Sequence, residues 1–450
     1  MDTSLIFKAY DVRGTYPDQI NEELARAIGA AFATFVAAPR IVIGRDMRPS
    51  GESLVAAFAE GARSVGTEVL NIGLASTDFL YFAAGHLDAP GAMFTASHNP
   101  SAYNGIKMCL AGAKPIGAES GLVEIEALTH QFLATPAHGE LAPTRDIDVL
   151  RDWVAHVRSF IDVDALRPLK IIADTANGMG GYVAPKIFEG LPFDVEIMYP
   201  ELDGTFPNHP ADPLNPENIV DLQRRVREAG ADIGLAFDGD ADRVFLIDEQ
   251  SAPISGSTTT AMVAASMLQK NPGATILYNV ICSKSVPAII EENGGVGRRT
   301  RVGHSYIKAE MAETNAIFGG EHSGHYYYRD NYRADSGIIT ALVVLELLSR
   351  HDGPLSTLVA PFQRFADSGE INTKVTSPAA SVAAIADKMR ATGADVDMLD
   401  GLTADFGDWW FNLRPSNTEP LLRLNVEAAT GEAVAEHVAY VRGLIAEVEA

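Results

Sequence analysis

Short apolar runs alternate along most of the chain with segments whose apolar residues recur at helical spacing. Residues 40–43 are typical of a buried strand, and the segment after them places apolar side chains on one helical face: Leu54, Phe58, Ala62 and Val65. Further strands are predicted at residues 68–72 and 91–95. Regular alternation of strands and helices is typical of α/β proteins. The pattern therefore predicts an α/β architecture.

The 450 residues are too many for one hydrophobic core and predict several domains. Two more α/β units follow the first, with strands predicted at residues 170–173, 194–198, 232–237, 274–278 and 317–319. After residue 365 the pattern changes to a strand, a helix, hairpin-like strands and a closing helix, which predicts a smaller α+β domain. The expected domains are residues 1–145, 146–248, 249–365 and 366–450.

A loop in the second unit is unusually rich in proline, with Pro200, Pro207, Pro210, Pro213 and Pro216. Proline donates no backbone hydrogen bond, so this loop is not expected to form a strand or a helix. Long ordered loops in compact domains are usually functional. We therefore expect this loop to have a functional role.

The formal net charge of −24 argues against a nucleic-acid or anionic-membrane partner, because phosphate groups would be repelled over most of the surface. No apolar run approaches the roughly 18 residues that cross a bilayer, and no secretory signal is visible. Cys109 and Cys282 are expected to be reduced and buried. These features predict a cytoplasmic protein, and they leave room for a small phosphorylated substrate.

The first candidate site is the loop 95–100, Thr-Ala-Ser-His-Asn-Pro, which follows a predicted strand. A serine at the carboxyl end of a strand is where α/β proteins place reactive groups. Ser97 is therefore a candidate nucleophile, and His98 and Asn99 offer donors to phosphate oxygens. Taken alone, the segment is also compatible with an ordinary turn.

The second site is the loop 238–243, in which Asp238, Asp240 and Asp242 alternate with small residues and Arg243 follows. Three carboxylates this close repel one another unless a cation lies between them. Hard oxygen ligands suit Mg²⁺. Calcium is a weaker alternative because the EF-hand spacing is missing. The other alternative is an acidic surface loop that binds no metal.

The third site is Gly-Glu-His-Ser-Gly-His at residues 320–325, where Glu321 and Ser323 could bind vicinal sugar hydroxyls. A zinc site at His322 and His325 is disfavoured, because the helical two-histidine motif and its cysteine alternatives are missing. The upstream segment 303–308, which includes His304, adds donors to the same wall. Ser305 is expected to cap a helix there.

The fourth site lies between two predicted strands of the last domain, at residues 414–420. Its donors suit a phosphate cradle, since a buried dianion must be met by several donors: Arg414, Ser416, Asn417 and Thr418. A plain β-turn is the alternative. Arg13 and Lys107 complete the candidates, provided that they face Ser97.

These loops, TASHNP, DGDADR, GEHSGH and RPSNTEP, together with KAYDVRG and GHSYIK, resemble those of the α-D-phosphohexomutase superfamily, and most closely its bacterial phosphomannomutases. The resemblance spans essentially the whole chain. It implies four domains around a central cleft, three of them α/β and the fourth smaller, with one loop from each. Ala241 stands where many members have glycine, and His322 is compatible with mannose.

The resemblance also implies residue roles. Ser97 would be the phosphoserine, and an oxygen of its phosphate would bind Mg²⁺ together with Asp238, Asp240 and Asp242. The reaction site would be lined by Arg13, Lys107 and Arg243, with Lys107 and His325 as candidate general bases. Substrate would be bound by His98, His304, Glu321, Ser323, Arg414, Ser416, Asn417 and Thr418.

The implied reaction interconverts mannose 6-phosphate and mannose 1-phosphate through a hexose 1,6-bisphosphate, which also serves as activator. Glucose or dual specificity is the nearest alternative, and glucosamine phosphate is less favoured. A phosphoserine-type phosphatase would not need the cradle of the fourth domain. A silent sugar-phosphate-binding protein would need neither nucleophile nor metal. The expected assembly is a monomer or a homodimer.

Overall fold

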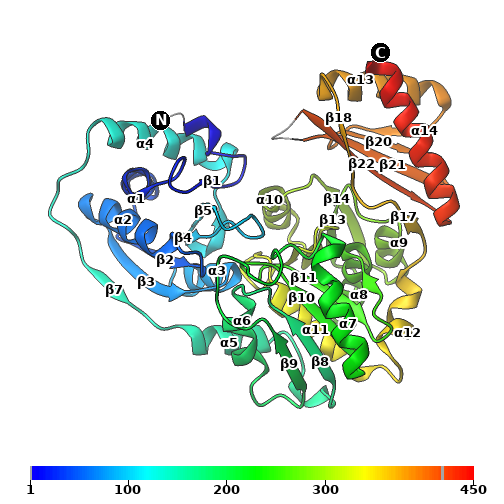
Figure 1. Cartoon of the computed structure of the whole chain (residues 1–450), viewed down its shortest axis with the longest axis horizontal. Helices are drawn as coiled ribbons and strands as arrows, with labels where there is room; N and C mark the ends of the chain where they lie inside the picture. The colour runs from blue at the N-terminus through cyan, green and yellow to red at the C-terminus, as the bar shows by residue number, and fades with distance from the viewer. Residues whose placement is uncertain (1–2, 417–419, 450) are drawn as a thin grey trace.

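The computed structural model describes residues 3–416 and 420–449, whose strands form four sheets. Figure 1 shows the first and fourth domains at opposite ends, with the second and third between them. Three domains are α/β and the fourth is α+β, so the predicted fold class is confirmed. Among the described residues, no helix is both long and apolar enough to cross a bilayer.

The first sheet has the order β1-β5-β4-β2-β3-β7, with β6 paired to β5. Its strands are β1 Val12–Thr15, β2 Arg40–Arg45, β3 Glu68–Leu74, β4 Gly91–Phe94, β5 Tyr103–Leu110, β6 Lys114–Pro115 and β7 Thr144–Asp146. Its helices are α1 Glu22–Val36, α2 Gly51–Ser64, α3 Thr77–His86 and α4 Leu122–Ala134. The domain limit proposed after residue 145 falls within β7, which pairs with β3 and so continues the first sheet.

The second sheet has the order β12-β11-β10-β8-β9, with β9, β8 and β10 parallel. Its strands are β8 Lys170–Asp174, β9 Asp194–Met198, β10 Ile233–Phe237, β11 Val244–Asp248 and β12 Pro253–Ile254. Its helices are α5 Leu150–Arg158, α6 Gly180–Phe188 and α7 Val220–Ala229. The serine loop (residues 95–100) follows β4 of the first sheet, and the aspartate loop (residues 238–243) follows β10 of this one. Both loops therefore begin where a parallel strand ends.

The third sheet has the order β14-β13-β15-β16. Its strands are β13 Thr275–Asn279, β14 Val296–Thr300, β15 Phe318–Gly320 and β16 Tyr326–Tyr328. Its helices are α8 Gly256–Lys270, α9 Ser285–Glu292, α10 His304–Thr314, α11 Gly337–Arg350 and α12 Leu355–Val359. The predicted cap at Ser305 is wrong: Gly303, at φ 130°, turns the chain so that α10 begins at His304.

The fourth sheet is antiparallel, with the order β17-β22-β21-β20-β19 and β18 beside β22. Its strands are β17 Ala366–Asp367, β18 Ile371–Lys374, β19 Asp395–Asp397, β20 Leu402–Asp405, β21 Trp409–Pro415 and β22 Leu421–Ala428, and its helices are α13 Pro378–Thr392 and α14 Gly431–Glu449. One apolar core runs from α3 through the second and third domains, whereas the fourth domain has its own core. The apolar core of the fourth domain is therefore separate from the one that joins the other three.

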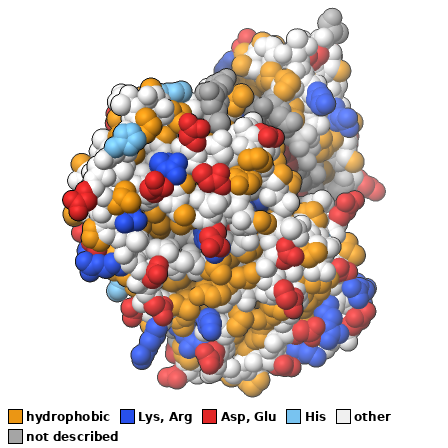
Figure 2. Space-filling view, turned by 60° about the vertical axis from the view of Figure 1, so that its left-hand side comes forward, with side chains coloured by type: hydrophobic (Ala, Val, Ile, Leu, Met, Phe, Trp, Pro, Cys, Tyr) orange, Lys and Arg blue, Asp and Glu red, His pale blue; other side chains and the backbone are white. Residues whose placement is uncertain are grey.

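On the face shown in Figure 2, acidic and basic side chains are interspersed and do not form one basic patch. This distribution agrees with the strongly acidic composition.

Candidate active site

Ser97 lies just beyond β4, in the left-handed backbone region at φ 49°. Its amide donates to Thr95 Oγ1 at 2.9 Å, and its hydroxyl donates to Asp238 Oδ2 at 2.7 Å. The side chains of the serine loop and the aspartate loop therefore meet directly, although they belong to different domains.

The aspartate loop brings together the three predicted metal ligands. Asp238, Asp240 and Asp242 are fully buried, and they offer oxygens that all lie within 4.8 Å of one another. Ala241 turns the chain between them at φ 58°. A Cβ on Gly239 would lie 2.4 Å from the Ser97 carbonyl oxygen, so only glycine allows the two loops to approach this closely.

Two buried cations balance part of this charge. Lys107 Nζ on β5 lies 2.8 Å from Asp240 Oδ2 and 2.7 Å from Asp242 Oδ2. Burial disfavours the charge on Lys107, but the two carboxylates outweigh it and raise the Lys107 pKa. Arg243 Nε donates to Asp238 Oδ2 at 2.9 Å. Burial nevertheless raises the pKa of Asp238 to about 7, opposed by Arg243 and reinforced by the other aspartates.

The donor set fits a hard divalent cation. Asp240 Oδ1 and Asp242 Oδ1 are buried and make no hydrogen bond in the described part of the chain. Burying such charged oxygens without a hydrogen bond is costly, and a bound cation would offset that cost. Because Ser97 Oγ lies against Asp238, a phosphate on Ser97 would bring another oxygen to the same place.

Arg243, His98 and Arg13 surround the serine hydroxyl. Arg243 Nη2 lies 3.2 Å from Ser97 Oγ and donates to His98 Nδ1 at 2.5 Å. Burial, followed by the charges of Arg243 and Arg13, lowers the pKa of His98, so its ring is a neutral acceptor. Arg13 Nη1 donates to Asn99 Oδ1 at 2.7 Å. Arg13 thus contacts the serine loop, and both Arg13 and Lys107 line the same cavity as Ser97.

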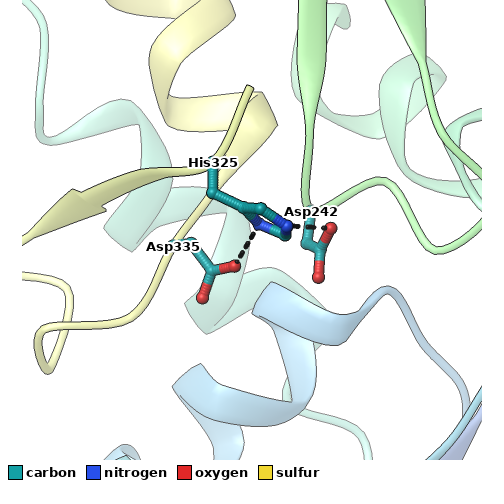
Figure 3. Close-up of side chains that lie close together, drawn as sticks. All are labelled: Asp242, His325 and Asp335. Carbon is teal, nitrogen blue, oxygen red and sulfur yellow. Dashed lines mark hydrogen bonds and ion pairs between the residues drawn. The ribbon is translucent and has the colours of Figure 1, made fainter. Parts of the chain in front are cut away.

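His325 is held by a carboxylate that sequence reasoning missed (Figure 3). Its Nδ1 donates to Asp335 Oδ2 at 2.8 Å and lies 3.8 Å from Asp242 Oδ1. Lys308 Nζ, itself buried, lies 2.9 Å from Asp335 Oδ1 and 3.8 Å from the centre of the Tyr81 ring. Nothing in the sequence marks Asp335, because it lies ten residues beyond His325 in a segment without a motif.

One backbone bridge and one side-chain hydrogen bond fix the neighbouring loops to each other. Arg243 and His325 form an antiparallel bridge, which joins the second and third domains beside the three aspartates. Thr77 at the start of α3 donates through Oγ1 to Asp240 Oδ2 at 2.6 Å. Three domains therefore build the reaction site together.

The Glu321 carboxylate makes hydrogen bonds within the third domain. Its side chain is buried, and its carboxylate accepts hydrogen bonds from the Tyr327 hydroxyl at 2.5 Å and from Asn279 Nδ2 at 3.0 Å. Ser323 is half-buried, and His322 Nδ1 lies 3.0 Å from Ser257 Oγ near the fourth domain. Contact of Glu321 and Ser323 with sugar hydroxyls remains a prediction.

The fourth domain contributes two guanidinium groups that lie opposite each other on neighbouring strands. Arg414 on β21 is directly opposite Arg423 on β22, and both pair with Glu370 at 3.5 and 3.3 Å. Ser416 follows β21, whereas the predicted ligands Asn417 and Thr418 lie outside the described residues. Arg423 was missed because it lies beyond the recognised loop, and only the strand register brings it opposite Arg414.

Two adjoining cavities connect these groups. A cavity of about 730 Å³ is lined by residues of the first three domains and by Arg423: among them Arg13, Ser97, His98, Lys107, Arg243, His304 and His325. A second, of about 410 Å³, is lined by Arg301, Tyr306, Asp400, Arg414 and again Arg423. Lys8, Tyr10 and Arg423 line both cavities. A ligand with a charged group at each end could therefore reach from Ser97 to the fourth domain.

Comparison with known proteins identifies four family models along the chain. They are described as phosphoglucomutase/phosphomannomutase alpha/beta/alpha domain I at residues 4–133, domain II at 151–251, domain III at 255–365 and the C-terminal domain at 370–444. Together they cover most of the sequence, in the order in which the structure presents its four sheets.

Two curated relatives are each 40% identical to this chain. A phosphomannomutase of Escherichia coli matches over 95% of this chain and 96% of its own length, and the phosphohexose mutases of Xanthomonas campestris pv. campestris over 96% of both. The crystal structure of a phosphoglucomutase/phosphomannomutase family protein from Burkholderia thailandensis is 31% identical, with a TM-score of 0.89 over 99% of this chain and 98% of that one. This chain therefore belongs to the phosphoglucomutase/phosphomannomutase family of α-D-phosphohexomutases.

Proposed function

We propose that this protein is a phosphomannomutase that interconverts mannose 6-phosphate and mannose 1-phosphate through a phosphorylated Ser97 and a mannose 1,6-bisphosphate intermediate. The observation that carries the proposal is the 2.7 Å contact between Ser97 Oγ and Asp238 Oδ2 in a cavity that also reaches Arg423. A nucleophile, an acidic cation site and a distant cationic cradle are the parts that a mutase needs.

The chemical step transfers one phosphoryl group. The bond between phosphorus and Ser97 Oγ breaks and a bond to the sugar hydroxyl oxygen forms. The hydroxyl proton passes to a base, and Ser97 Oγ leaves as an alkoxide facing Arg243. Such transfers depend mainly on positioning and charge stabilisation, which Arg243 at 3.2 Å from Ser97 Oγ can supply. Of the two candidate bases, geometry favours His325, since Lys107 Nζ is shared by two carboxylates.

Mg²⁺ would be held by Asp238, Asp240 and Asp242 with an oxygen of the phosphoserine. When bound, it would neutralise charge on the transferring phosphoryl group. Asp240 Oδ1 and Asp242 Oδ1, which accept no hydrogen bond in the described part of the chain, support this assignment.

The unreacted end of the substrate is assigned to the fourth domain. Arg414, Ser416, Asn417 and Thr418 would bind its phosphate, with His98, His304, Glu321 and Ser323 as further substrate contacts. After the first transfer the bisphosphate would turn end for end and return its other phosphoryl group to Ser97. A phosphatase would not need this distant grip, so the paired Arg414 and Arg423 favour a mutase.

Mannose is the preferred sugar in this proposal because the curated relatives include a phosphomannomutase at 40% identity. Dual specificity for glucose is the second candidate, and the family description, which names both mutases, supports it. We further propose a cytoplasmic enzyme, monomeric or homodimeric, that is activated by a hexose 1,6-bisphosphate.

The test is a coupled mutase assay with mannose 1-phosphate and glucose 1-phosphate, each with Mg²⁺ and a catalytic amount of hexose 1,6-bisphosphate. The proposal expects a higher kcat/KM for mannose 1-phosphate and no activity in Ser97→Ala. Equal values for the two sugars would support the dual-specificity candidate. Release of inorganic phosphate without isomerisation would refute a mutase.

A further inference from the structure

Arg48 is a buried arginine whose guanidinium is devoted to the backbone of the serine loop. Its Nη2 donates to the carbonyl oxygens of Ser97 at 2.8 Å and Asn99 at 2.6 Å. Its Nη1 donates to those of Pro100 and Tyr103, both at 2.8 Å. One side chain thus holds four carbonyl groups, from the serine itself to the start of β5.

The guanidinium is in turn fixed from its own side. Asp46 Oδ2 lies 3.2 Å from Arg48 Nε, both side chains are 0% exposed, and the Arg48 amide donates to Asp46 Oδ1 at 2.9 Å. The planar guanidinium places its donors in a fixed fork, which the point charge of a lysine could not reproduce.

The proline-rich loop of the second domain covers this arrangement. The Phe206 ring lies 5.3 Å from the Arg48 guanidinium carbon, and a Cβ on Gly204 would come within 2.7 Å of Arg48 Cα. The loop is anchored to the turn after β8, where Asn208 Nδ2 donates to Asn177 Oδ1 at 2.8 Å. Covering Arg48 is therefore a specific candidate for the functional role predicted for this loop.

We propose that Arg48 is a positioning residue that keeps the Ser97 hydroxyl aligned with the aspartate loop. Phe206 shields the Arg48 guanidinium from water in this proposal. Ser97 occupies a left-handed conformation, at φ 49°, that a serine rarely adopts without support. Its carbonyl, held by Arg48, is the group packed against Gly239 of the aspartate loop. Fixing that carbonyl therefore fixes the nucleophile against the cation site.

The proposal rests on the proposed mutase function and is tested with Arg48→Lys in the full-length protein. Misplacing a reacting group by about 1 Å can lower a rate by about 100-fold, so kcat should fall by about this factor while KM stays within about twofold. Phosphorylation of Ser97 by hexose 1,6-bisphosphate, followed by intact mass, should slow in parallel.

Arg158→Lys is the matched control. Arg158 also binds backbone carbonyls, donating twice to Ile187 O at 3.1 and 2.9 Å and once to Glu189 O, but it lies away from the serine loop. Both variants should unfold at lower temperature, and only Arg48→Lys should lose kcat. Equal kcat values for the two variants would overturn the proposal, whereas an inactive wild type would instead refute the mutase function.

If Arg48→Lys does not fold, Phe206→Ala tests the positioning role of Arg48 instead. It leaves every donor of Arg48 in place and removes only the cover, so kcat should fall by on the order of tenfold as the alignment loosens. Guanidinium added to a folded Arg48→Ala variant should restore part of kcat, and the same addition to Arg158→Ala should have no effect. An unchanged kcat in Phe206→Ala, or absence of rescue in folded Arg48→Ala, would contradict the proposal.

Discussion

Ser97 Oγ lies 2.7 Å from Asp238 Oδ2, although the two residues are 141 positions apart and belong to different sheets. Each stands just beyond the carboxyl end of a parallel strand, which is where reactive groups of α/β proteins gather. Because the strands β4 and β10 fix the loops, this contact is a property of the fold.

Removing the charge of Lys107 should destabilise the metal-free protein. Lys107→Met leaves Asp240 and Asp242 buried without their cation, a change that typically costs about 3–5 kcal/mol. Thermal unfolding in chelator should show the loss, and Mg²⁺ should restore a larger share of stability than in the wild type. Lys388→Met, which removes an exposed pair with Glu447, is the control and should change stability by less than about 1 kcal/mol.

Asp335 should act on the reaction through His325. Asp335→Asn keeps an acceptor for Nδ1 but removes the charge, so kcat should fall by about 100-fold, the lower end of what a positioned acid or base supplies. The double variant Asp335→Asn/Lys308→Met should recover stability, because Lys308 is no longer buried unpaired, without recovering kcat. Asp330→Asn is the exposed control. Full kcat in Asp335→Asn would show that His325 does not depend on this carboxylate.

The fourth domain should retain the intermediate. Arg414→Ala is expected to lower turnover and to release more hexose 1,6-bisphosphate per cycle, because one of the two guanidinium groups opposite each other on β21 and β22 is lost. Arg423→Ala should raise KM by on the order of tenfold, the value of one charge-assisted hydrogen bond. Arg390→Ala on α13 of the same domain should leave both quantities unchanged. An unaltered rate and no extra free bisphosphate in Arg414→Ala would refute the cradle.

His209 should make stability depend on pH. Burial lowers the pKa of His209, but Asp174 at 3.1 Å outweighs it, with a smaller contribution from Asp221, so the pKa in the folded state is raised above 6.5. The protonated ring therefore adds stability that is complete below the unfolded-state pKa and disappears as the pH rises through the folded-state value. The stability difference between wild type and His209→Gln should therefore be larger at pH 6 than at pH 9. Equal losses at the two pH values would contradict the assigned pair.

Sequence reasoning identified the loops better than the interactions that hold them. Ser97 and the three aspartates are recognisable because reactive loops follow parallel strands and carry dense polar chemistry. Asp335, Arg48 and Arg423 are not, since each reaches the site through tertiary packing or strand register. The sequence also could not indicate that Glu321 is enclosed by Tyr327 and Asn279, because burial of a loop carboxylate depends on neighbours far along the chain.

The most direct test is to mix the purified protein with mannose 1,6-bisphosphate and Mg²⁺, record its intact mass, and then add mannose 1-phosphate. The account predicts that one phosphate appears on wild type and none on Ser97→Ala, and that the added sugar phosphate removes it as bisphosphate. A phosphate on another residue, or one that leaves only as inorganic phosphate, would contradict the assignment of Ser97 as the group that carries the transferred phosphoryl.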